Sequence, residues 1–247
     1  MTNRIVIDCF PDSASKYLDS HVIVVIDVIR ATTTAVSGVN IGRRIFPVRT
    51  TDEAFILAKK LHNPLLAGEL GGNVPYGFDL TNSPVQIEAL SAIPSGKFTD
   101  PSRPIILLSS SGTQLMKNAE RSKAVYIACF RNISAVAHHL AGRHQSIAII
   151  GAGTRGEFRR EDQMCCAWIA GKLIKRGYEP ETVTTEEVIS RWENAGVDDV
   201  RGGRSEGYLK RSGQIHDLEF ILSRFDDLDV VPMLIDEELV RASLTIE

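Results

Sequence analysis

The chain has 247 residues, is 43% hydrophobic, and carries 28 basic against 31 acidic residues. This length and apolar content suffice for one buried core, so we expect residues 1–247 to form a single α/β domain. The net charge of −3 excludes the strongly basic surface that binding to nucleic acid requires.

The first residues, MTNRIVIDCF, contain no apolar core of a signal peptide, and the longest apolar run ends at Asp27, far short of membrane length. We therefore expect a cytoplasmic protein with no membrane partner. The sequence leaves the oligomeric state open, a homo-oligomer included. The cysteines follow neither zinc nor disulfide spacing and are predicted to be reduced core thiols: Cys9, Cys129, Cys165 and Cys166.

Apolar runs rich in Val and Ile alternate with amphipathic stretches through the first two-thirds of the chain. The runs predict strands at 4–10, 21–29, 45–48, 64–68, 104–109, 124–130 and 146–150. The stretches predict helices, most clearly at 51–61, 112–120 and 133–142. This alternation predicts a three-layer α/β fold, a mostly parallel but mixed sheet with helices on both faces, whose functional groups follow the carboxyl ends of strands.

After about residue 158 the pattern becomes mainly helical. We expect helices within 161–177, 184–196 and 215–225, and a last strand at 230–235. The Gly- and Arg-rich segment 197–213 is interpreted as a solvated surface connection, with a mobile flap as the alternative.

The first polar loop is VIVVIDVIRATTT, where Asp27 ends a buried strand and Arg30 precedes three threonines, Thr32 to Thr34, at a helix start. A buried carboxylate needs an ionic partner or a metal, while helix-start amides, hydroxyls and a guanidinium suit an anion. The structural alternative is an ion pair between Asp27 and Arg30 with a threonine N-cap.

The second polar loop, 65–84, carries Glu69, Asp79 and Asn82 among four glycines. Glycines permit close approach to a ligand, and a hard carboxylate oxygen such as that of Glu69 suits Mg²⁺. The alternative is a surface loop with solvated acids.

The third polar loop places Ser109 to Ser111, Gly112 and Thr113 at another helix start, where amides and hydroxyls can bind a tetrahedral anion. Ordinary helix capping is the alternative. Asn132 follows the next strand and adds a polar group at the same expected edge of the sheet.

The fourth polar loop is GAGTRGEFRRED, with glycines in G-x-G-x-x-G spacing after a strand. A dinucleotide site would need a second strand after the helix that ends in an acid, and no Val- or Ile-rich strand follows here. The loop is therefore expected to bend around an anion. Glu161 and Asp162 at the next helix start either favour the helix dipole or reach a metal.

Six blocks carry a family resemblance: DVIRATTTAV, AGELGG, GFDLTNSP, SSSGT, the loop of Asn132 and GAGTRGEFRRED. In order and spacing they resemble the 2-phosphosulfolactate phosphatase family, from about residue 4 into the C-terminal stretch. The resemblance implies an α/β fold and Mg²⁺-dependent hydrolysis of (R)-2-phospho-3-sulfolactate to 3-sulfolactate and phosphate, on a route to coenzyme M. The fourth block usually reads Thr-Thr-Asn-Gly-Thr in that family. The serines here bear on substrate choice more than on hydrolysis, because their hydroxyls and amides still suit an anion.

With the resemblance, the loops imply Mg²⁺ held by some of Asp27, Glu69, Glu161 and Asp162, and catalytic roles for Asp27, Arg30 and Glu69. Substrate-binding roles are expected of Thr32, Thr33, Asn82, Ser110, Gly112, Thr113, Asn132, Gly153 and Thr154. The nucleophile stays open between water and a carboxylate such as Asp27. Two other functions remain as alternatives: an NAD(P)-dependent oxidoreductase using the GAGTRG loop, and a noncatalytic anion-binding relative.

Overall fold

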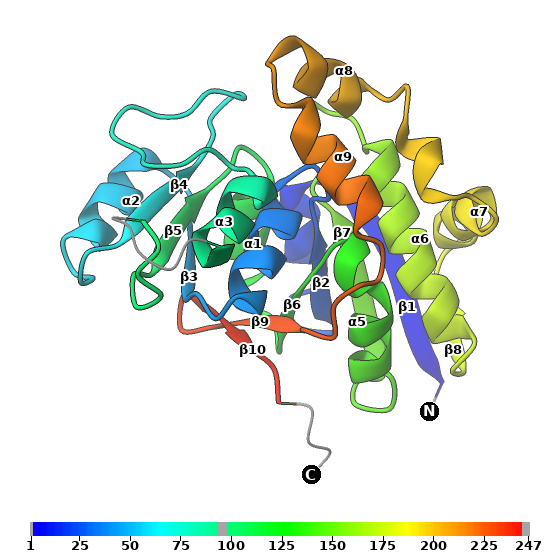
Figure 1. Cartoon of the computed structure of the whole chain (residues 1–247). Coiled ribbons are helices and arrows are strands. Elements are labelled where there is room, and N and C mark those ends of the chain that lie inside the picture. Colours follow the sequence, from blue (N-terminus) through cyan, green and yellow to red (C-terminus); the bar gives the residue numbers. More distant parts are fainter. Residues whose placement is uncertain (1, 93–97, 244–247) are drawn as a thin grey trace.

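The computed structural model describes residues 2–92 and 98–243, and the strands within these ranges form one ten-stranded sheet (Figure 1). The strands are Asn3–Cys9 (β1), Val22–Ile26 (β2), Ile45–Val48 (β3), Leu65–Gly68 (β4), Ile105–Leu108 (β5), Val125–Ala128 (β6), Ser146–Gly151 (β7), Tyr178–Pro180 (β8), Pro232–Ile235 (β9) and Glu238–Arg241 (β10). Their order is β4-β5-β3-β10-β9-β6-β2-β7-β1-β8.

Two parallel groups of strands make up most of this sheet. One group is β4-β5-β3, and the other is β6-β2-β7-β1-β8. The antiparallel β9–β10 hairpin joins them through single residue pairs, Leu239 with Ile45 and Met233 with Tyr126. Because Ile45 opens β3 and Tyr126 is the second residue of β6, the hairpin bridges the groups at the start of both strands and crosses the lower part of the view in Figure 1.

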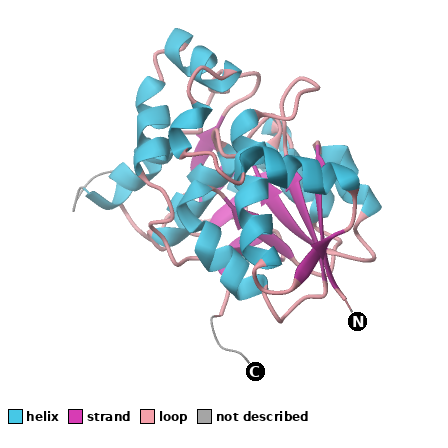
Figure 2. Ribbon diagram, turned by 90° about the vertical axis from the view of Figure 1, so that its right-hand side faces the viewer, coloured by secondary structure: helices cyan, strands magenta, loops and turns pink. Residues whose placement is uncertain are grey.

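Helices cover both faces of the sheet, as Figure 2 shows. They are Ala31–Asn40 (α1), Thr51–Ala58 (α2), Pro84–Ala92 (α3), Gly112–Ala119 (α4), Ile133–Leu140 (α5), Arg160–Ile174 (α6), Val183–Trp192 (α7), Arg204–Arg211 (α8) and Ile215–Ser223 (α9). Short 3-10 helices span Pro11–Lys16 (η1), Phe130–Asn132 (η2) and Val197–Val200 (η3). The predicted α/β fold, with a mixed, mostly parallel sheet between helical layers, is confirmed.

The central strand β2 shows why the sequence gives this layering. All five of its side chains, VIVVI, are buried. Successive strand residues point to opposite faces, so Val22 and Val24 join the core beneath α5 and α6, whereas Ile23 and Val25 join the core beneath α1 and α4. A strand buried on both faces has to lie inside a three-layer fold.

The strands predicted up to residue 150 and at 230–235 are found with small changes at their ends, and so are the predicted helices. Two strands were not predicted, β8 and β10, since both are short and carry charged residues. The interpretation of 197–213 as a solvated connection is wrong, because this segment contains η3 and the helix α8, with Leu209 completely buried. None of the helices in the described ranges has the length and apolar character needed to cross a membrane.

Candidate active site

A cavity of about 760 Å³ lies where the loops after β2, β4, β5 and β7 meet beneath α8. One wall is acidic and carries Asp27 and Glu69. Other elements that line it are basic, with Arg155 and Arg159 before α6 and Arg204 and Arg211 on α8. This arrangement suits a ligand of mixed charge, a cation against the acids together with a small polyanion.

Asp27 follows β2 directly and is held by neighbouring backbone. The amides of Ala31 and Gly112 hydrogen-bond its carboxylate. Gly112 opens α4 so close to Asp27 that a Cβ at this position would stand 2.5 Å from Oδ2. Burial raises the pKa of Asp27 to about 7, and the charges of Glu69 and Glu161 add to the increase. Across residues 2–92 and 98–243 no basic side chain forms an ion pair with Asp27.

Glu69, after β4, connects two of the polar loops. Its carboxylate accepts hydrogen bonds from the Ser110 amide at 2.7 Å, the Ser110 hydroxyl at 3.0 Å and the Gly72 amide at 2.7 Å. These bonds fix Glu69 at the cavity wall beside Asp27 and come from neutral donors. The negative charge of Glu69 is therefore not cancelled.

Arg30 is buried and does not pair with Asp27, so the structural alternative considered for this loop is wrong. Its Nη1 donates to Asp217 on α9 at 2.5 Å and also to Gln214. Arg30 still lines the cavity, and its remaining donors are left for an anion.

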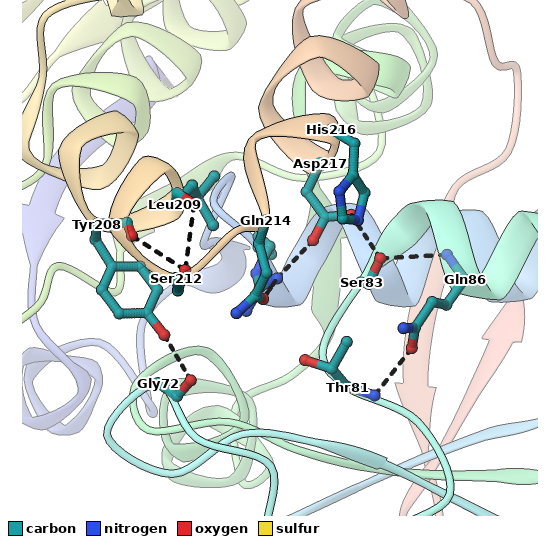
Figure 3. A network of polar contacts seen from close by, with 11 residues as sticks. Gly72, Thr81, Ser83, Gln86, Tyr208, Leu209, Ser212, Gln214, His216 and Asp217 are labelled. Carbon is teal, nitrogen blue, oxygen red and sulfur yellow. Dashed lines mark hydrogen bonds and ion pairs between the residues drawn. The ribbon is translucent and has the colours of Figure 1, made fainter.

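Asp217 was missed by the sequence reasoning. It is completely buried, pairs with Arg30 and accepts a 2.5 Å hydrogen bond from Ser83 ahead of α3 (Figure 3). The sequence feature that could have identified Asp217 is its position on the apolar face of the helix at 215–223, beside Leu218 and Ile221, where an acid needs a partner.

The two acids at the start of α6 lie behind the cavity wall. Asp162 accepts the amide of Val28 at 2.9 Å with one oxygen and that of Gly153 at 3.2 Å with the other. Glu161 accepts the hydroxyl of Ser205. Burial raises the pKa of both carboxyls. Neither residue lines the cavity, yet both lie near Asp27: the charge of Glu161 raises the pKa of Asp27, and the charge of Asp27 raises that of Asp162.

Several predicted substrate-binding side chains are used within the protein. The hydroxyls of Thr32, Thr33 and Thr113 bond backbone groups of their own loops, where they fix the turns. Asn132 bonds the amide of Cys129 and two carbonyls with its own amide group, outside the cavity. The structure does not bring these four side chains to the cavity.

The predicted residues Asn82, Ser110 and Thr154 do line the cavity, together with Ser111. Asn82 is only 3% exposed, and its Oδ1 has no hydrogen-bond partner among the described residues. Because an unsatisfied buried acceptor is costly, this atom indicates a bound group that donates a hydrogen bond or a cation that accepts the oxygen as a ligand.

The glycine loop after β7 forms a hairpin. Thr154 and Glu157 exchange backbone hydrogen bonds of 2.9 and 3.1 Å, with Arg155 and Gly156 at the tip, and Gly153 precedes it at a φ of 60°. The strand after α6, β8, pairs with β1 rather than with β7, and Glu181 beyond it bonds His21. This geometry differs from the adjacent strands and ribose-binding acid of a dinucleotide site.

Helix α8 covers the cavity through specific contacts. The Tyr208 hydroxyl donates to the carbonyl of Gly72 in the loop after β4 at 2.5 Å, as Figure 3 shows. Ser205 contacts Glu161 on the other side. The basic residues that α8 and the 154–157 hairpin contribute were not singled out from the sequence, although the Gly- and Arg-rich composition of 197–213 was the available signal.

The donor set at the cavity agrees with Mg²⁺ rather than with a metal held entirely by protein. Within residues 2–92 and 98–243, no three His, Cys, Asp or Glu side chains form a ready-made metal group. Mg²⁺ usually takes only one or two carboxylates and completes its shell with water and substrate oxygens. Asp27 and Glu69, two hard carboxylates without a counter-charge, fit that requirement.

Comparison with known proteins gives consistent matches. A family model described as 2-phosphosulpholactate phosphatase matches residues 9–237. Proteins named "Probable 2-phosphosulfolactate phosphatase" are similar to this chain: one from Pseudothermotoga lettingae is 32% identical over 90% of this chain and 92% of that protein. Another from Thermotoga maritima is 32% identical over 86% and 88%. A third, from Carboxydothermus hydrogenoformans, is 33% identical over 65% and 64%. The matched region extends from the end of β1 to the β9–β10 turn.

Proposed function

This chain belongs to the 2-phosphosulfolactate phosphatase family, a family of phosphoric monoester hydrolases, and we propose that it hydrolyses (R)-2-phospho-3-sulfolactate to 3-sulfolactate and phosphate in a Mg²⁺-dependent reaction, on a route to coenzyme M. The observation that carries the proposal is the cavity itself. Two carboxylates that pair with no basic side chain of the described chain, Asp27 and Glu69, line it together with basic elements, and the space is large enough for a small polyanion.

Asp27 and Glu69 are the residues that would hold Mg²⁺. When bound, the ion would neutralise charge on the phosphoryl oxygens and make the phosphorus a better electrophile. The neutral donors that fix Glu69 and the amides that hold Asp27 keep both carboxylates in place. The loops after β4 and β2, from which they come, are joined through the loop after β5: Ser110 bonds Glu69, and Gly112 contacts Asp27.

The remaining groups of the cavity orient the reactants. Arg30 offers a fixed positive charge to the phosphate, because Asp217 holds one of its terminal nitrogens. The unpartnered Oδ1 of Asn82 accepts a hydrogen bond from the attacking water. The water oxygen forms a bond to phosphorus as the bond from phosphorus to the ester oxygen breaks, and the proton that the water loses ends on the ester oxygen, which becomes the hydroxyl of the product. Helix α8 limits the entry of other water molecules.

A phosphate-release assay tests this function. We expect wild-type protein to release phosphate from phosphosulfolactate, to lose this activity in EDTA and to recover it with Mg²⁺. Asp27→Asn should lower kcat/KM more than about 100-fold, because it removes a charged ligand, whereas Asp52→Asn on the exposed side of α2 serves as the matched control with wild-type activity.

Each other outcome of the assay has a definite meaning. Activity that resists EDTA would overturn the metal requirement while retaining the hydrolase. If the protein turned over none of a panel of phosphorylated acids, the hydrolase function would be overturned. Binding of sulfolactate would then favour a noncatalytic relative. Saturable binding of NAD(H) would instead favour an oxidoreductase. A phosphoenzyme trapped from wild type and absent in Asp27→Asn would replace direct attack by water with attack by the carboxylate.

A further inference from the structure

We propose that Arg155, assisted by Arg211, recognises the second acidic group of the substrate, the carboxylate or sulfonate that lies beyond the phosphate ester. This inference rests on the proposed phosphatase function. It assigns the choice among phosphate esters to arginines rather than to the acidic residues Asp27 and Glu69.

The arginines at the cavity fall into two kinds. Three have an acidic partner: Arg30 pairs with Asp217, and Arg159 and Arg204 both pair with Glu157. Arg155 and Arg211 form no ion pair or side-chain hydrogen bond with any residue of the described chain, and both line the cavity. Two guanidinium groups that line a cavity without a protein partner are suited to an acidic ligand, since arginine binds carboxylates and sulfonates through paired N–H donors.

The backbone at Arg155 strengthens this assignment. Arg155 has a φ of 52° and Gly156 a φ of 75°, so both central residues of the two-residue hairpin are left-handed. Such turns favour Asn or Gly at the first position, and a bulky side chain there strains the backbone. An arginine at a position that suits glycine, in a hairpin that lines the cavity, indicates a ligand-binding role.

Arg211 reaches the cavity from a different element. It ends α8, one turn after Gly207, and its Nη1 lies 3.3 Å from the point where a Cβ of Gly207 would stand. Gly207 and Arg211 both line the cavity, so the missing side chain leaves room for the guanidinium on the inner side of the helix. The two arginines therefore reach one cavity from two separately folded elements.

Steady-state kinetics on three substrates test the proposal: phenyl phosphate with no second acid, 2-phospholactate with a carboxylate, and phosphosulfolactate with a carboxylate and a sulfonate. We expect Arg155→Gly to reduce the preference for phosphosulfolactate over phenyl phosphate, as the ratio of kcat/KM values, about tenfold or more, mainly through KM. A loss shared by 2-phospholactate assigns Arg155 to the carboxylate, and a loss confined to phosphosulfolactate assigns it to the sulfonate. Arg211→Ala should change the same ratio.

The matched control is Asp236→Gly. Asp236 occupies the first left-handed position of the β9–β10 turn, at a φ of 46°, as Arg155 does in its hairpin, and does not line the cavity. Both glycine variants should have a Tm at or above that of wild type, because both relieve a left-handed side chain, but only Arg155→Gly should change the substrate ratio.

A second readout separates this proposal from the proposed function. Calorimetric binding of 3-sulfolactate needs no turnover, and we expect its affinity to fall about tenfold in Arg155→Gly. If wild type hydrolyses no substrate, the phosphatase function fails while this binding result still decides the role of Arg155. Unchanged ratios and unchanged sulfolactate affinity in both Arg155→Gly and Arg211→Ala would overturn the inference.

Discussion

At the scale of single residues, the site depends on the close approach of α4 to Asp27. Any side chain at Gly112 would place its Cβ 2.5 Å from Asp27 Oδ2 and 2.6 Å from the Cβ of Ala31. Both neighbours belong to the loop and helix that follow the central strand β2, so neither can retreat without moving the site. Gly112 is therefore required for steric reasons rather than for an unusual backbone angle.

We expect Gly112→Ala to lower the free energy of unfolding by about 1–3 kcal/mol through overpacking, and to reduce kcat/KM roughly 100-fold because Asp27 is displaced. Gly171→Ala in α6 is the control: a Cβ there would meet nothing within 4 Å, and the change should stabilise the helix by up to about 1 kcal/mol. Urea unfolding and kinetics of both variants give the answer, and wild-type activity in Gly112→Ala would contradict the steric argument.

At the scale of elements, α9 fixes the loop that follows β2. Its buried Asp217 bonds Ser83 at the start of α3, as Figure 3 shows. Asp217 also bonds Arg30, and so connects α9 to the loop after β2. A buried ion pair of this kind is costly to break, because the remaining charge keeps its desolvation penalty. The orientation of Arg30 at the cavity is thus set by a helix near the C-terminal end of the chain.

Removing the acid from α9 should destabilise the protein and weaken substrate binding together. We expect Asp217→Ala to cost about 3–5 kcal/mol of stability, because Arg30 is left buried and unpaired, and to raise KM. Glu219→Ala, two residues later on the same helix, removes only an exposed pair with Arg201 and should cost less than about 1 kcal/mol. Chemical denaturation compares the two, and equal losses would show that burial of the pair is unimportant.

At the scale of the whole molecule, the pH dependence of stability includes a contribution far from the site. His139 on α5 is 5% exposed, packs edge-on to Tyr126 at 5.3 Å, and its Nδ1 lacks a partner among the described residues. Burial, together with the charges of Arg143, His144 and His138, lowers the pKa of His139 to about 4. The folded protein therefore binds this proton less readily than the unfolded chain does.

Because the pKa of His139 is lower in the folded protein than in the unfolded chain, protonation of His139 favours unfolding. Its cost is absent above the pKa of about 6.5 in the unfolded chain and grows as the pH falls toward 4. We expect His139 to account for a loss on the order of 2–3 kcal/mol across this window. His139→Gln should show a shallower decline, whereas His138→Gln, one residue earlier and exposed, should follow wild type. Denaturation curves from pH 4 to 7 measure the slopes, and parallel slopes for His139→Gln and wild type would contradict this account.

The sequence by itself determined the alternation of strands and helices, the mixed sheet with two helical layers, and four polar loops. These follow from local periodicity and from strands such as VIVVI whose composition requires burial on both faces. The position of Asp27 and Glu69 directly after predicted strands was also predictable, because functional groups follow the carboxyl ends of strands in such sheets. That the loops after β2 and β4 meet, although five strands lie between these two in the sheet, was not predictable. The same reasoning put too many polar residues at the cavity, including Asn132.

Only the tertiary structure decided which of those polar groups are left for a ligand. Arg30 pairs with Asp217 across 187 positions, and Asp162 bonds the Val28 amide across 134. Helix α8 closes over the cavity and brings Arg211 toward the site of Asp27. Such long-range contacts consume the hydrogen-bonding capacity of some side chains and leave others, such as Asn82 and Arg155, without a partner in the described chain. Local sequence pattern specifies each element, but the partners of a side chain depend on how distant elements pack.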